Sequence, residues 1–140
     1  MAAFNKFNSF VEALAEKKHD LGADTLKVLL CNTAPLATNT LKANLTELTA
    51  GNGYTAGGAT ASITSSTQTT GTYKLVLGDP ATWTATGGSI GPFRYAVLYN
   101  DTATNDELIG WWDYGSSVTL ATGESFAVDF DPTTGVLTIA

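Results

Sequence analysis

The sequence predicts a single, mainly β domain: an antiparallel β-sandwich or barrel-like fold with one N-terminal α-helix. Only 14% of its 140 residues are charged, whereas an ordinary soluble domain carries roughly 25%. Thr, Ala, Gly, Ser and Asn fill the difference; Thr favours strands, and Gly and Asn favour the turns between them. This length suits one core but is short for two. We therefore expect residues 1–140 to form one domain, with a helix within 1–20 and the sandwich or barrel over 24–140.

The N-terminal segment predicts a helix over residues 3–18 that ends near His19, before Gly22. Its apolar residues recur at helical spacing and form one stripe: Phe4, Phe7, Phe10, Val11 and Leu14. An apolar stripe of this size cannot stay exposed in a stable soluble protein. We therefore expect it to pack on the sheet of its own domain or on a neighbouring chain.

The remainder predicts a succession of short strands joined by turn residues. The expected strands are 26–31, 61–65, 73–77, 82–84, 93–99, 108–112, 117–120, 125–130 and 136–139. Turns are expected at 100–101, 114–115, 121–123 and 131–135, the last two with Gly in a left-handed position. In 125–130 the alternation points Phe126, Val128 and Phe130 to one face. Residues 44–47 resemble a capping box, which predicts a brief helical turn, and the glycine-rich residues 50–58 predict a flexible loop.

Charge and composition argue against several classes of function. The net charge is −6 and the basic residues are few and scattered, so we expect no nucleic-acid binding. No apolar run is long enough for a signal peptide or a membrane span, so we expect no membrane contact and synthesis in a cytoplasm. The single Cys31 cannot form an internal disulfide, which agrees with a reducing compartment.

Residues with catalytic or ligating potential follow no recognised motif, so we expect no enzyme, catalytic residue, cofactor or metal. His19 is the only histidine, Cys31 lies in a strand pattern, and neither a nucleophile elbow nor a phosphate-binding loop is present. Calcium loops place oxygen ligands densely on one turn, and no such stretch is found. A glycosidase-like pair among Asp113, Asp129 and Asp131 stays open from sequence alone, although so short a chain leaves little room for a substrate cleft.

The adjacent residues Trp111 and Trp112 must point to opposite faces of a strand. One can lie in the core; the other is covered by the helix or offered to a partner, where aromatic anchors are common. The expected interface residues are Phe4, Phe7, Tyr54, Trp111 and Trp112. A rival interpretation is a carbohydrate-binding module that stacks sugar rings on Trp83, Trp111 or Trp112.

Four segments carry a resemblance to a known group of proteins: FNKF (4–7), DTLKVLL (24–30), GYTAGG (53–58) and GPFRYAVLY (91–99). With them, the chain resembles small virion structural proteins of the tailed bacteriophages over most of its length. The resemblance implies a head decoration (cement) protein or an accessory tail protein. We expect a decoration protein on the capsid surface that binds the major capsid protein or other virion proteins, with a tail or tail-fibre component as the alternative.

The expected strands also predict self-association. Open sheet edges are usually blunted by charge or proline. Few such residues stand in or beside these strands: Lys74, Arg94, Glu107, Asp113 and Asp129. Pairing with another chain would satisfy such an edge, so we expect an oligomer or a place in a lattice.

Overall fold

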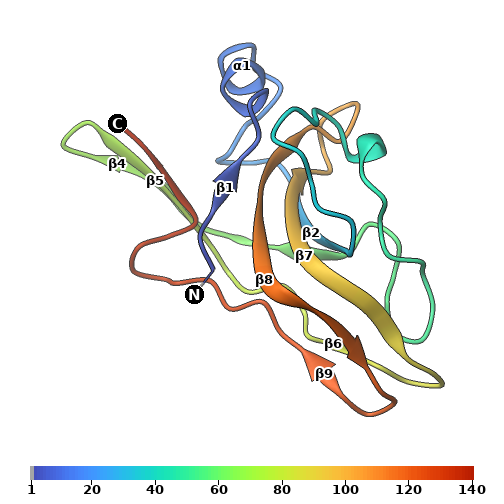
Figure 1. Cartoon of the computed structure of the whole chain (residues 1–140). Coiled ribbons are helices and arrows are strands. Elements are labelled where there is room, and N and C mark those ends of the chain that lie inside the picture. Colours follow the sequence, from blue (N-terminus) through green and yellow to red (C-terminus); the bar gives the residue numbers. More distant parts are fainter. Residues whose placement is uncertain (1) are drawn as a thin grey trace.

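The computed structural model describes residues 2–140, and its largest element is a five-stranded antiparallel sheet (Figure 1). Met1, the first residue of the expected domain and of its helical region, lies outside the described residues. The strand order is β1-β8-β7-β2-β3. The strands span Asn5–Lys6 (β1), Leu26–Cys31 (β2), Ala59–Ala61 (β3), Ile90–Asn100 (β7) and Leu108–Leu120 (β8).

A second antiparallel sheet has the order β10-β5-β4 and projects from the rest of the molecule (Figure 1). Its strands are β4 (Ile63–Thr69), β5 (Thr72–Leu77) and β10 (Leu137–Ile139), and a two-stranded pair joins β6 (Trp83–Thr84) to β9 (Ser125–Phe126). The mainly β, antiparallel class with a helix near the N-terminus is confirmed. The sheets do not close into a barrel, so the barrel-like alternative is wrong.

The N-terminal helix is much shorter than residues 3–18. Helix α1 covers only Phe10–Ala15, and Asn5–Lys6 form strand β1 instead. Asn5 pairs with Trp111 in β8, and the Phe7 amide donates to the Ile109 carbonyl at 3.2 Å. Because these long-range hydrogen bonds satisfy the backbone, the segment before Ser9 has no need of helical ones. At the other end, Lys17 adopts a left-handed φ of 65° and ends the helical path before His19.

Most expected strands are confirmed in position, with four corrections. The expected strand 61–65 is wrong as a single element, because Ala61 ends β3 in the five-stranded sheet and Ile63 begins β4 in the three-stranded sheet. The expected turn at residues 114–115 is wrong, because β8 runs through it with Gly115 at a φ of 102°. Of the expected strand 125–130, only Ser125–Phe126 pair, although Phe126 and Val128 are half-buried and Phe130 is buried, as the alternation predicts. The expected helical turn after residues 44–47 is wrong; a 3₁₀ turn, η1 (Lys42–Asn44), ends at Asn44 instead.

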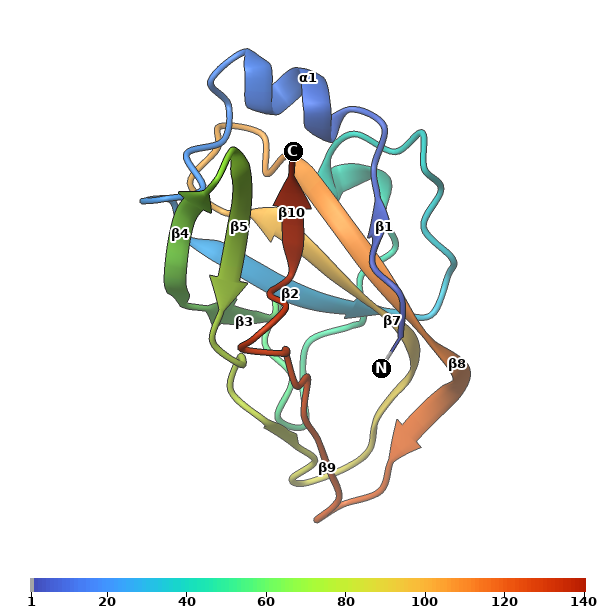
Figure 2. The same cartoon turned by 90° about the vertical axis from the view of Figure 1, so that its left-hand side faces the viewer.

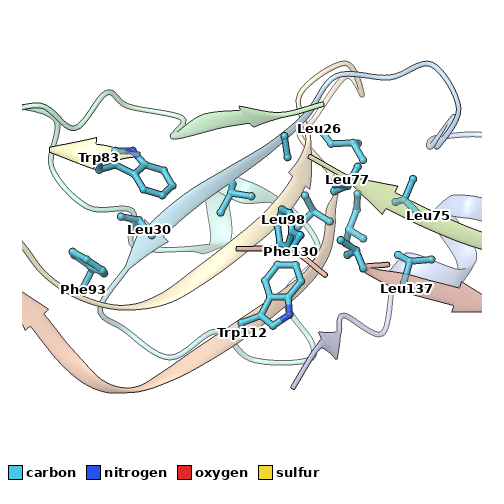
Figure 3. Packing of buried hydrophobic residues seen from close by; sticks show 14 of the residues in the cluster. Leu26, Leu30, Leu75, Leu77, Trp83, Phe93, Leu98, Trp112, Phe130 and Leu137 are labelled. Atoms are coloured by element: carbon cyan, nitrogen blue, oxygen red, sulfur yellow. The ribbon is translucent and has the colours of Figure 1, made fainter. Parts of the chain in front are cut away.

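The core lies on both faces of the five-stranded sheet. The larger cluster extends towards the three-stranded sheet, where Leu26 and Leu98 face Leu75, Leu77 and Leu137, and its other end holds Leu30, Trp83 and Phe93 (Figure 3). The smaller cluster covers the opposite face and consists of Phe7, Leu29, Cys31, Val97, Tyr99 and Leu108. Successive residues from Val28 to Cys31 in β2 alternate between the two clusters, as a strand buried on both faces requires. Within residues 2–140, no helix has the length and apolar character needed to span a bilayer.

Candidate functional site

An apolar groove of about 710 Å³ separates the N-terminal segment from strand β10. Figure 2 looks onto this side of the molecule, with β10 and β1 in front and α1 above them. Its lining residues come from β1, α1 and the C-terminal strand: Phe4, Lys6, Phe10, Val11, Leu14, Ala15, Val136, Leu137, Thr138 and Ile139. Lys6 is the one charged member of this lining. Val11 and Ile139 are 54% and 39% exposed, so apolar side chains are open to solvent here.

Two open strand edges border this groove. β1 pairs with β8 and β10 pairs with β5, and each is the outermost strand of its sheet. An outermost strand presents unpaired N–H and C=O groups along its free side. The groove therefore combines an apolar floor with backbone groups that can bind an extended segment.

The expected interface residues are divided between the two faces of the five-stranded sheet. The Phe7 ring lies 4.6 Å from that of Trp111 on one face, and the Phe4 ring lies 5.4 Å from that of Trp112 on the other. The opposite orientation of the two indoles is thus as predicted. Phe4 also lines the groove, whereas Phe7 and Trp112 are buried within the chain. Trp111 is half-buried and packs against Phe7, which is fully buried, so Trp111 lies on the solvent side of this contact.

Tyr54, the fifth expected interface residue, is buried in the core and is 3% exposed. Its hydroxyl accepts a hydrogen bond from the Leu30 amide at 3.1 Å and donates one to Glu47 Oε1 at 2.9 Å. Burial raises the pKa of Tyr54 above its ordinary value. Glu47 Oε1 also accepts from the Gly57 amide, and the Tyr99 hydroxyl donates to the Gly57 carbonyl at 2.7 Å. Side chains therefore anchor the glycine-rich loop that the sequence predicts to be flexible.

A second, more polar cleft of about 1010 Å³ lies beside residues 17–24 and the 102–107 loop. At its margin His19 is 5% exposed, and its Nδ1 lies 3.1 Å from the Asn100 side-chain amide nitrogen. The same nitrogen donates to Asp24 at 2.6 Å. The Asn100 oxygen accepts the Thr102 and Ala103 amides, which fixes the orientation of the side-chain amide.

This geometry assigns an acceptor role to His19 Nδ1 and places the ring proton on Nε2. Nε2 is buried and has no hydrogen-bond partner among residues 2–140. Burial lowers the pKa of His19, and the carboxylates of Glu107 and Asp24 partly oppose that shift. The imidazole is therefore a neutral element of a buried polar network that holds residues 18–24 against the end of β7.

Other groups with chemical potential are held in structural contacts. Burial raises the pKa of the Cys31 thiol to about 12, which leaves it protonated. The Arg94 guanidinium lies 2.7 Å from Asp113 and lowers the pKa of that carboxyl. The Thr133 amide does the same for Asp131. A glycosidase acid needs a raised pKa, so neither carboxyl suits that role. Within the described chain, no three His, Cys, Asp or Glu side chains gather in an arrangement that could hold a metal.

Sequence reasoning missed two residues that organise these regions. Glu47 is expected in a capping box, but its carboxylate accepts hydrogen bonds from the 50–58 loop. No local sequence pattern predicts this contact. Asn100 is expected only as a turn residue, yet it is fully buried and its side chain joins residues 18–24 to the turn at 100–103. Its position between a buried strand and Asp101-Thr102 could have indicated this role, since an Asn there can cap the following turn with its own side chain.

Comparison of the chain with protein-family models, with curated proteins and with solved structures found no match. Function is therefore inferred from the chain's own surfaces and from the resemblance seen in its sequence.

Proposed function

We propose that this protein is a non-enzymatic structural component of a bacteriophage virion, a decoration protein that binds the head shell and stabilises it. The observation that carries the proposal is the open apolar groove between β1, α1 and β10. The resemblance of residues 4–7, 24–30, 53–58 and 91–99 to virion proteins supplies the context. Both point to a protein that acts by binding another protein.

The proposed occupant of the groove is an extended, mainly apolar segment of a shell protein. The open edges of β1 and β10 would supply backbone hydrogen bonds to such a segment. Val11, Leu14 and Ile139 would lose exposed apolar area to it. Because Lys6 is the one charged lining residue, the binding should change little between low and moderate salt.

Stabilisation would follow from mass action. A protein that binds only the assembled shell shifts the equilibrium towards that state. The net charge of −6 suits a protein that must avoid the packaged or free genome. A small domain with few charges also leaves its binding surface free of strong desolvation costs.

The test uses particles that lack this protein and measures their survival on heating or osmotic shock. Addition of the purified wild-type protein should restore survival. Val11→Asp and Ile139→Asp place charge in the groove at exposed positions, so they should fold normally and fail to restore it. The matched control is Leu36→Asp, because Leu36 is 62% exposed and does not line the groove. Equal survival with and without the protein would contradict the decoration role.

The tail or tail-fibre alternative uses the same kind of surface. It differs from the main proposal in where the protein sits on the particle. Labelled particles with the protein on the tail would favour it. The carbohydrate-binding alternative loses support at two of its three tryptophans, because Trp83 and Trp112 are buried, whereas Trp111 is half-buried against Phe7. A sugar platform needs an aromatic face open to solvent.

A further inference from the structure

Strand β4 is the longest of the outermost strands in the sheets of the described chain. The outermost strands β1, β3 and β10 contain two or three residues each, and so do the paired strands β6 and β9. β4 contains seven residues and pairs only with β5. In Figure 2 it forms the outer margin of the projecting three-stranded sheet. Short edge strands are one way in which proteins prevent unwanted pairing, and β4 is the one outermost strand of the described chain that is longer than three residues.

β4 also lacks the chemical features that protect an edge. Its sequence, ITSSTQT, contains no charged residue and no proline. A bulge between Ile63 and Ser65 disturbs only its first residues, and the ladder with β5 is regular from Ser65 to Thr69. The outer part of the strand is therefore a regularly paired, neutral edge whose free side carries unpaired backbone groups.

We propose that two copies of this chain associate by antiparallel pairing of their β4 strands about a two-fold axis. The neutrality of β4 suits a second copy, because antiparallel self-pairing places each residue opposite one from the same strand. Any charge in β4 would then face or neighbour its own sign, which is destabilising. Because β4 has none, every self-pairing register is free of that repulsion.

The proposed dimer joins the three-stranded sheet of one copy to that of the other. The outer edges of the joined sheet are then the two β10 strands, which have three residues each. A two-fold contact of this kind closes on itself and does not propagate into a fibre. Because the interface is one short strand pair per copy, we expect a weak dimer with a Kd on the order of 10–100 µM. The groove residues take no part, so self-association does not depend on the proposed shell contact.

Thr67→Glu tests the proposal, and Thr138→Glu is its matched control. Thr67 and Thr138 are both exposed, and both lie directly opposite Lys74, one on β4 and the other on β10. Each substitution therefore adds the same charge beside the same lysine within one copy. Only T67E places like charges across the proposed dimer axis, and it should raise the dimer Kd at least about tenfold at low salt.

Sedimentation of the purified full chain over roughly 5–500 µM supplies the readout. A wild-type dimer weakened by T67E and unchanged by T138E supports the proposal. A wild-type chain that stays monomeric throughout this range overturns it, as does a dimer weakened by T138E alone. In a second measurement, Thr67→Cys should form an oxidative cross-link between copies and Thr138→Cys should not. Native Cys31 is fully buried and gives no background; a failure of the Thr67→Cys variant to cross-link in a confirmed dimer would place the interface elsewhere.

Discussion

Replacement of Glu47 by Ala should destabilise the protein because two buried donors lose their acceptor. The Tyr54 hydroxyl and the Gly57 amide both donate to Glu47 Oε1. A buried donor left without a partner costs about 1–3 kcal/mol. The Glu47 side chain is 19% exposed, so water can reach part of the site and the lower end of that range applies. For the two donors together, we expect Glu47→Ala to lower the free energy of unfolding by about 2–3 kcal/mol. Glu47→Gln keeps an acceptor oxygen and should lower it by about 1 kcal/mol.

Urea denaturation of the variants measures these differences at constant pH. The matched control is Glu16→Ala, because Glu16 is exposed and its side chain makes no hydrogen bond or ion pair within residues 2–140. Its effect should stay within about 0.5 kcal/mol. Hydrogen exchange at the Gly57 amide should accelerate in Glu47→Ala and stay unchanged in the control. Equal unfolding midpoints for the two alanine variants would refute the view that Glu47 anchors the 50–58 loop.

Buried groups elsewhere in the chain supply the other predictions. Phe7→Ala should cost about 3–5 kcal/mol in urea denaturation, because the ring is fully buried, whereas Val11→Ala at an exposed site should cost less than about 0.5 kcal/mol. Because burial lowers the pKa of His19 in the folded state, the unfolded chain binds the proton more readily. Stability should therefore fall as the pH drops below about 6.5, and His19→Gln should reduce this dependence; an unchanged pH profile would contradict it. With a pKa of about 12, Cys31 should react with a thiol reagent only after unfolding, and fast labelling of the native protein would show that its burial is wrong.

The N-terminal segment shows where local pattern misleads. The spacing of Phe4, Phe7 and Phe10 fits a helix, yet the first two residues contact opposite faces of the sheet through β1. A period of three residues does not distinguish these outcomes, because the pairing partner in β8 lies about a hundred residues away. Gly115 misleads similarly: a left-handed glycine suits a turn as well as an irregular strand. Local sequence carries no information about which partner strand is present.

Buried strands and tight turns were far more predictable. The apolar run of β2 and the alternation around Phe126 and Phe130 follow directly from burial on one or both faces. The turn ending at Gly135 was also predictable, since that residue has a φ of 73° and its amide donates to the Asp131 carbonyl. The candidate groove was only partly predictable. Phe4 and the α1 residues were expected to pack or bind, but the contribution of β10 depends on how distant segments meet.

The most direct test of the proposed function is a cryo-electron microscopy map of intact particles that contain this protein. The account predicts density for the chain on the outer surface of the head, with an extended segment of a shell protein in the groove between β1 and β10. The side chains of Val11 and Ile139 should then be covered. Density for the chain on the tail, or a head-bound chain whose groove faces solvent, would contradict the account.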